Sequence, residues 1–94
     1  MRFVSFRHKG LERFWRDDDA KGLPRQQVEK LRAMLTAIEE ADGIHEIALF
    51  SGWRLHALKG ARKGTWSMTV TRNYRLTFKL KDKAVEDVDL EDYH

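Results

Sequence analysis

The chain has 94 residues, of which 41% are apolar and 11% aromatic, a composition that suits one domain with a small core and excludes a disordered chain. It contains no cysteine, which excludes disulfides and thiolate metal sites and agrees with a reducing cytosol. No apolar run approaches the ~20 residues of a membrane span, and the charged N-terminus is unlike a signal peptide. We therefore expect a cytoplasmic protein that does not bind membranes.

The net charge of +3 is unevenly distributed along the chain. Residues 33–53 hold four acids and no Lys or Arg, whereas residues 54–83 hold nine Lys or Arg and one acid, a net charge of +8. Residues 84–94 hold five acids and again no Lys or Arg. A basic block of this density is typical of a protein that binds a polyanion, usually RNA or DNA. A solvated basic face without a partner explains the charge equally well, so charge alone does not decide.

The first half of the chain predicts a short strand followed by two helices. Phe3 and Phe6 bracket the strand, and a short helix is expected over about 8–16. Pro24 is a favourable helix start, and the apolar residues after it recur at spacings of three and four, at Val28, Leu31, Leu35 and Ile38. This spacing predicts an amphipathic helix over about 24–41, with a single turn expected around 44–48.

The second half alternates apolar and polar residues, which predicts half-buried strands over about 53–58, 66–70, 74–80 and 84–90. A basic loop bounded by Gly60 and Gly64 follows the first of these strands, and short polar turns join the others as hairpins. The predicted fold is α+β in one domain over 1–94, with the order strand, helix, helix and four strands. Its small sheet is antiparallel, with both helices packed on the apolar face.

Three basic side chains of different kinds are expected to meet on the polar face of this sheet. Alternation places Arg54 and His56 on one side of their strand, Lys59 follows at the mouth of the basic loop, and Arg75 lies on a neighbouring strand. An imidazole near neutral pKa can take the 2′ proton of RNA, and cations can stabilise the charge on the reacting phosphoryl group. The trio therefore suits RNA cleavage through the 2′-hydroxyl.

Each of these residues also has an ordinary structural interpretation. A strand histidine is more often structural than catalytic, and an isolated loop lysine or strand arginine is usually only solvated. Trp53 and Trp66 fall on the apolar phase, so we expect them in the core. No motif for a metal, a nucleotide or a covalent nucleophile is present, so we expect no metal and no cofactor.

Five segments, in order and in spacing, resemble HigB-type toxins (plasmid-maintenance killers) of the RelE/ParE superfamily. They are SFRHKGL at 5–11, GWRLHALKG at 52–60, GTWSMTV at 64–70, NYRLTF at 73–78 and EDYH at 91–94. The departures are small, because Tyr74 stands where relatives often have an indole and Ala57 where they often have a proline. The resemblance covers nearly the whole chain and implies a RelE-like fold.

The resemblance also implies a function and partners. The chain would be the toxin of a type II toxin–antitoxin system, held inactive by a HigA-like helix-turn-helix antitoxin and reaching operator DNA only through it. Such toxins enter the A site of the small ribosomal subunit and cut the mRNA there without a metal. Two alternatives remain open: a ParE-like inhibitor of DNA gyrase on the same scaffold, and an RNA-binding module that does not cleave.

The matching motifs imply roles for individual residues. His56 would be the general base, and Lys59 and Arg75 would hold the scissile phosphate. Asp92, Tyr93 and His94 match the terminal triplet, in which Tyr93 would stack on or orient a base and His94 would be the general acid, although the two histidines could exchange roles. Further basic side chains are expected to bind RNA, namely Arg54, Arg62, Lys63, Arg72 and Lys79. The acidic terminus is expected to fold back toward the basic face.

Overall fold

A computed structural model describes residues 1–93. His94 lies outside the described residues, so the role expected for it remains a prediction. The elements, with η marking 3-10 turns, are β1 (Arg2–Phe3), α1 (Lys9–Asp17), η1 (Arg25–Gln27), α2 (Val28–Glu40), α3 (Ile44–Ile47), η2 (Ser51–Trp53), β2 (His56–Ala57), η3 (Gly60–Arg62), β3 (Thr65–Thr69), β4 (Tyr74–Lys81) and β5 (Ala84–Asp92). In this part of the chain, no helix has the length and apolar character to cross a membrane.

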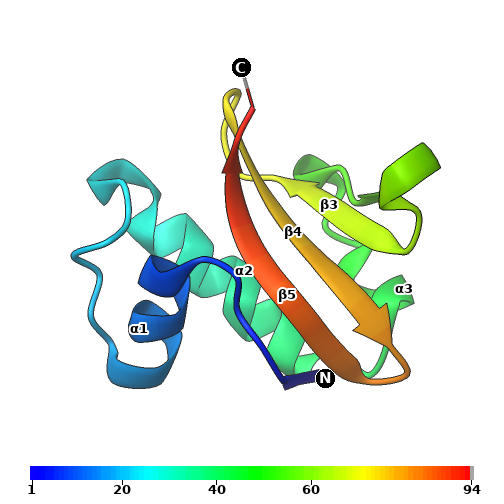
Figure 1. Cartoon of the computed structure of the whole chain (residues 1–94), viewed down its shortest axis with the longest axis horizontal. Coiled ribbons are helices and arrows are strands. Elements are labelled where there is room, and N and C mark those ends of the chain that lie inside the picture. The colour runs from blue at the N-terminus through cyan, green and yellow to red at the C-terminus, as the bar shows by residue number, and fades with distance from the viewer. Residues whose placement is uncertain (94) are drawn as a thin grey trace.

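The strands form one sheet in the order β1-β5-β4-β3-β2, which Figure 1 shows from the face opposite the long helix. The four later strands are antiparallel, as predicted. The expectation of a purely antiparallel sheet was wrong at one edge, because β1 pairs in parallel with β5, and Phe6 continues this pairing with a bridge to Val88.

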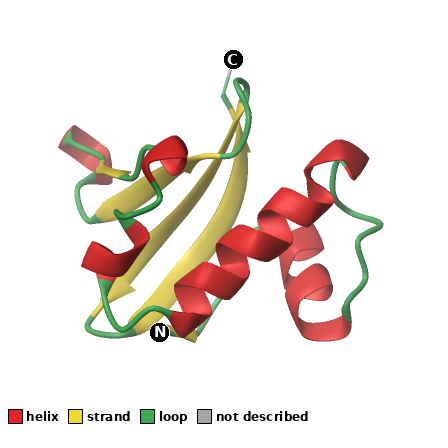
Figure 2. Cartoon of the chain, turned by 180° about the vertical axis from the view of Figure 1, so that it is seen from behind, coloured by secondary structure: helices red, strands yellow, loops and turns green. Residues whose placement is uncertain are grey.

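The helices α1 and α2 lie side by side on one side of the sheet (Figures 1 and 2). The side chain of His8 accepts the N–H of Leu11 at 3.1 Å, which caps the start of α1 and gives this histidine a structural role. Leu31, Leu35 and Ile38 of α2 are buried, which confirms the predicted apolar stripe. The sheet contributes alternate residues of its strands to the same core, including Met68, Leu76, Phe78 and Val88.

A bulge in β5 decides which side chains reach the polar face. The register shifts between Thr77 and Lys79, and Asp87 opposite this shift has a left-handed backbone with φ 53°. The extra residue lets Val85 and Val88 both face the core although they are three residues apart. Beyond the bulge the alternation resumes, so Glu91 is directed to the polar face beside Arg75, its partner in the ladder.

Most predicted boundaries agree with the structure within two residues, and two elements differ more. The helix expected over 24–41 begins as the 3-10 turn η1, and its α-helical part is Val28–Glu40. The strand expected over 53–58 is reduced to His56–Ala57, because Trp53 belongs to a 3-10 turn and Arg54 has a left-handed φ of 50°. The ring of Trp53 stacks on Phe50 with centroids 4.2 Å apart, which favours a turn at this position.

Candidate active site

The polar face of β2, β3 and β4 is hollowed into a groove of about 290 Å³. Its floor follows the ladder, because His56 pairs with Ser67 and Ser67 pairs with Thr77. Ser67 and Thr77 are buried, so the face expected to be open is partly covered. The lining residues come from β2, β3, β4 and β5 and from the segments that flank β2 and follow β5, and are Arg54, His56, Leu58, Arg62, Ser67, Thr69, Arg75, Thr77, Glu91 and Tyr93.

His56 lies exposed at the rim of this groove, on the two-residue strand β2. Its Nδ1 is 3.0 Å from the backbone carbonyl oxygen of Arg54. A carbonyl only accepts hydrogen bonds, so this contact requires that Nδ1 carries the proton. In the neutral imidazole, Nε2 then has a free lone pair, as a general base needs.

Arg75 lies on β4 and is held by the backbone around it. Its Nη1 donates to the carbonyl oxygens of Thr71 at 2.8 Å, Arg72 at 3.1 Å and Tyr74 at 3.1 Å. The guanidinium carbon also lies 4.7 Å from the ring centroid of Tyr93, a cation–π contact. All three hydrogen bonds use Nη1, which leaves Nε and Nη2 for a phosphate in the groove that Arg75 lines.

Tyr93 extends the groove beyond the end of β5. Its backbone N–H donates to the carbonyl oxygen of Asn73, which joins the terminus to the turn between β3 and β4. The side chain is 66% exposed, so one face of the ring contacts Arg75 while most of the ring is open to solvent. A base of RNA can stack on an aromatic ring presented in this way.

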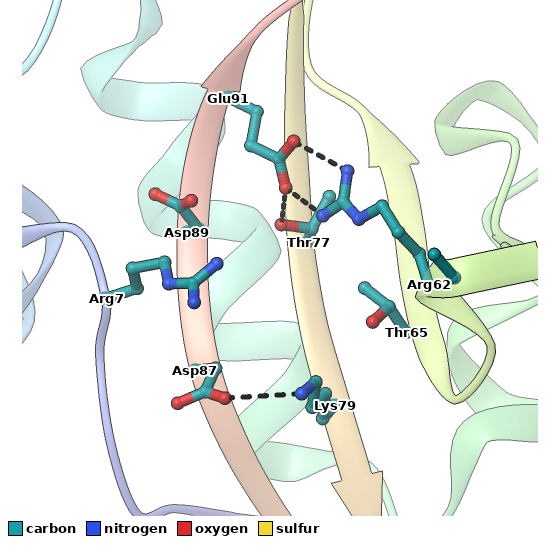
Figure 3. Close-up of a pocket in the computed structure, with 9 residues that line it drawn as sticks. Arg7, Arg62, Thr65, Thr77, Lys79, Asp87, Asp89 and Glu91 are labelled. Carbon is teal, nitrogen blue, oxygen red and sulfur yellow. Dashed lines mark hydrogen bonds and ion pairs between the residues drawn. The ribbon is translucent and has the colours of Figure 1, made fainter.

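Glu91 lies among these cations and was not recognised from the sequence. Its carboxylate accepts two hydrogen bonds from Arg62, at 2.9 and 2.5 Å, and one from the hydroxyl of Thr77 at 2.5 Å (Figure 3). These hydrogen bonds, with that of Arg62 first, hold the pKa of Glu91 below its ordinary value of 4.5. The same contact raises the pKa of Arg62. The acidic terminus therefore reaches the basic face at Glu91, although residues 91 and 92 continue β5 and do not fold back as expected.

Figure 3 also shows a second hollow, of about 180 Å³, next to the groove. Arg7 from the N-terminal segment projects between Asp87 and Asp89, and Lys79 lies 3.8 Å from Asp87. Arg62, Thr77 and Glu91 line both hollows. Acids and bases alternate here, so the positive charge of the sheet is largely balanced on this side, unlike the rim at His56.

The basic loop 59–64 carries three of the predicted residues. Gly60 and Gly64 have φ of 66° and 96°, which confirms that glycines bound it, since other residues rarely adopt these angles. Lys59 and Lys63 are exposed, and Lys59 is not among the residues that line the groove. Arg62 reaches the groove but is paired with Glu91, which lowers its availability for RNA.

The remaining predicted residues are dispersed. Arg54 lines the groove, Arg72 is exposed on the turn between β3 and β4, and Lys79 pairs with Asp87. Asp92 follows Glu91 in the strand and pairs with Tyr74 in the ladder, so alternation directs it to the opposite face. Among residues 1–93, no group of three acids and histidines is arranged to hold a metal ion.

Solved structures that resemble this chain are RelE-like toxins. YafQ from E. coli is 17% identical, covers 98% of this chain and 93% of its own, and superposes with a TM-score of 0.59. A YoeB dimer from Staphylococcus aureus is 18% identical, covers 100% of this chain and 97% of its own, and has a TM-score of 0.61. At such identities the likeness shows the fold alone, and it confirms the α+β architecture expected from the sequence.

Sequence comparison is more specific. The Endoribonuclease HigB of Proteus vulgaris is 39% identical to this chain over 90 residues, which are 96% of this chain and 97% of that protein. Residues 4–94 match the HigB-like toxin family, described as the RelE-like toxin of the type II toxin–antitoxin system HigB. The chain therefore belongs to the HigB-like family of RelE-like toxins of type II toxin–antitoxin systems.

Proposed function

We propose that this toxin, an endoribonuclease of the HigB type, acts in the cytoplasm and cuts mRNA in the A site of the small ribosomal subunit. The groove described above would receive the mRNA, with the 2′-hydroxyl as nucleophile and without a metal. The observation that carries the proposal is the combination in one groove of an imidazole in the tautomer of a general base and a guanidinium held by backbone carbonyls. Strands in a sheet are about 4.8 Å apart, so β2 and β4, which are separated by β3, lie about 10 Å apart.

The reaction begins when Nε2 of His56 takes the proton of the 2′-hydroxyl. The 2′ oxygen then forms a bond to the adjacent phosphorus, and the bond between phosphorus and the 5′ oxygen breaks. The departing 5′ oxygen takes a proton from His94, a role assigned from the sequence alone. The products are a 2′,3′-cyclic phosphate and a 5′-hydroxyl, so atoms and protons balance.

The extra negative charge of the pentacoordinate phosphoryl group is stabilised by cations. Arg75 offers the unbonded part of its fork, and Lys59, at the start of the basic loop, contributes its ammonium group. Tyr93, already stacked on Arg75, positions a base with the open part of its ring. Asp92 keeps the place in the terminal triplet that the family resemblance implies. Arg54, Arg62, Lys63, Arg72 and Lys79 supply contacts to flanking phosphates.

A type II toxin has an antitoxin partner, and we propose that this one is a HigA-like helix-turn-helix protein. Through that antitoxin the toxin would reach operator DNA. The membership of the HigB-like family supports this assignment.

The direct test is to add the purified protein to a reconstituted translation reaction and to map mRNA ends by primer extension. We expect cuts at codons in the A site, and none in the same mRNA incubated with protein but without ribosomes. Equal cutting of the free mRNA would contradict the ribosome dependence. Intact mRNA in both reactions would contradict the nuclease activity and favour the gyrase inhibitor, which a supercoiling assay would then examine.

A further inference from the structure

Glu91 is a negative charge in a groove proposed to bind a polyanion. Its side chain is 27% exposed and lines both hollows of the polar face. A carboxylate in this position repels RNA phosphates, so we expect it to have another role that offsets this unfavourable effect on binding.

The contacts of Glu91 join parts of the fold that are distant in sequence. The carboxylate projects from β5 across β4 and accepts hydrogen bonds from both terminal nitrogens of Arg62. Arg62 is the last residue of the η3 turn in the basic loop. The hydroxyl of Thr77 on β4 donates to Oε2 of the same carboxylate, which fixes its orientation (Figure 3). A bidentate pair of this kind is specific in geometry as well as favourable in energy.

The basic loop has little else to hold it on the sheet. The backbone N–H of Leu58 donates to Thr65 at its base, and the bonds of Arg62 and Lys63 to Lys59 and Gly60 stay within the loop. Among the side-chain hydrogen bonds of residues 1–93, those that join the loop to the sheet all run from Arg62 to Glu91. The position of the loop that Lys59 begins is therefore set by the Leu58–Thr65 hydrogen bond at its base and by the Arg62–Glu91 pair at its far end.

We propose that Glu91 is a positioning residue, which acts through Arg62 to hold loop 59–64 at the groove so that Lys59 meets the scissile phosphate. The inference rests on the proposed nuclease function. It has a second consequence, because the pair that places the loop also occupies Arg62 and adds a negative charge to the groove. Glu91 therefore aids the chemical step and weakens the binding of RNA.

Glu91→Gln separates these two effects, because it keeps the size and removes the charge. We expect RNA binding to tighten by about two- to fivefold, the range of one exposed ion pair released for a phosphate. The slope of log K against log salt should steepen by about 0.7, as one further phosphate contact on a single strand requires. The rate of cleavage on the ribosome should fall by about 10- to 100-fold, since small misplacements of a catalytic cation are costly.

The test compares Glu91→Gln, Arg62→Gln and the double variant with the wild type in two assays. Affinity is measured with a single-stranded RNA oligonucleotide at several salt concentrations. The rate of mRNA cleavage is measured at saturating toxin in the reconstituted translation reaction. Asp42→Asn is the matched control, because it removes the ion pair with Lys83 on the turn between β4 and β5. We expect this control to match the wild type in both assays, and the double variant to cut no more slowly than Arg62→Gln.

The outcomes distinguish this inference from the proposed function. A wild type that does not cut would overturn the proposed function, and this inference with it. A wild type that cuts, beside a Glu91→Gln protein of unchanged rate, would overturn the inference alone. A parallel loss of affinity, rate and thermal stability in Glu91→Gln would also overturn it, because that pattern marks a carboxylate that only supports the fold.

Discussion

The strands β3, β4 and β5 and the segment 51–64 contribute to the same groove but are built differently. The strands are joined by long ladders, and their inner residues, such as Met68, Leu76 and Val88, are fully buried. The segment 51–64 consists of two 3-10 turns and a two-residue strand, and most of its side chains are exposed. Arg75 lies on β4, whereas His56 and Lys59 lie in the segment 51–64.

This difference indicates that the two regions have different roles in the groove. The ladder fixes Arg75 and the floor of the groove, while the base and the second cation are held by few contacts, chiefly the carbonyl of Arg54 and the pair of Arg62 with Glu91. Elements with few buried contacts open more readily than a core sheet. The groove is therefore rigid on one side and adjustable on the other, which suits a substrate held by a large partner such as the ribosome.

The largest effect is expected from His56→Ala. Loss of a general base costs about 100- to 10,000-fold in rate. Because the side chain is exposed and lies on the lightly held segment, the thermal stability should change little. Cleavage rates in the translation reaction and melting curves of the same preparations check both parts, and a large loss of stability would contradict the proposed separation of segment and sheet.

The sheet should respond in the opposite way to substitution of its core. Leu76→Ala is expected to lower the free energy of unfolding by about 2–5 kcal/mol, because its side chain is fully buried. Leu55→Ala, in the segment and only partly buried against the core, should cost about 1 kcal/mol. Denaturant unfolding measures both, and equal losses would show that the segment is as firmly packed as the sheet.

The pair of Arg62 and Glu91 predicts a dependence of stability on pH. Because the pKa of Glu91 is lowered in the folded protein, its contribution is present above the unfolded value near 4.5 and is lost as pH falls through the lowered pKa. Wild type should exceed Glu91→Gln by about 0.5–1 kcal/mol near pH 7, given the exposure of the pair. The difference in melting temperature should disappear well below pH 4.5, and a difference that grows toward acid would contradict the contact.

The smallest effect concerns the cations outside the centre of the groove. Lys63→Gln should lower the slope of log K against log salt for single-stranded RNA by about 0.7, the loss of one phosphate contact. Lys79→Gln should lower it less, because Lys79 is already paired with Asp87 on the sheet. Titrations of an RNA oligonucleotide across salt concentrations compare the two, and equal slopes would show that this pairing does not restrain Lys79.

Hydrophobic periodicity was sufficient for the central strands and the long helix. The spacing of Leu31, Leu35 and Ile38 predicted the buried face of α2, and alternation predicted β3 and β4. The parallel pairing of β1 could not be predicted, since two residues carry too little pattern to give a direction. The spacing of three between Val85 and Val88 was a signal of the bulge in β5, because an unbroken strand buries residues two apart.

The segment 51–64 was less predictable because its structure depends on single contacts. Alternation was expected to place Arg54 and His56 together, and both line the groove, although the strand supporting them is much shorter. Glu91 is one of five acids in residues 84–94, and its sequence neighbours do not distinguish it from the other four as a residue of the groove. Only the bulge and the fold of the basic loop bring it to Arg62, and neither is encoded by a local motif.

The most direct test of the central claim uses an mRNA with one 2′-deoxynucleotide on the 5′ side of a mapped cleavage position, translated in the presence of the toxin. If the groove works through the 2′-hydroxyl and His56, the cut at that position should disappear while cuts at unmodified codons persist and end in a 2′,3′-cyclic phosphate. A cut that survives the deoxy substitution would contradict the account, because the bond would then be broken by another nucleophile.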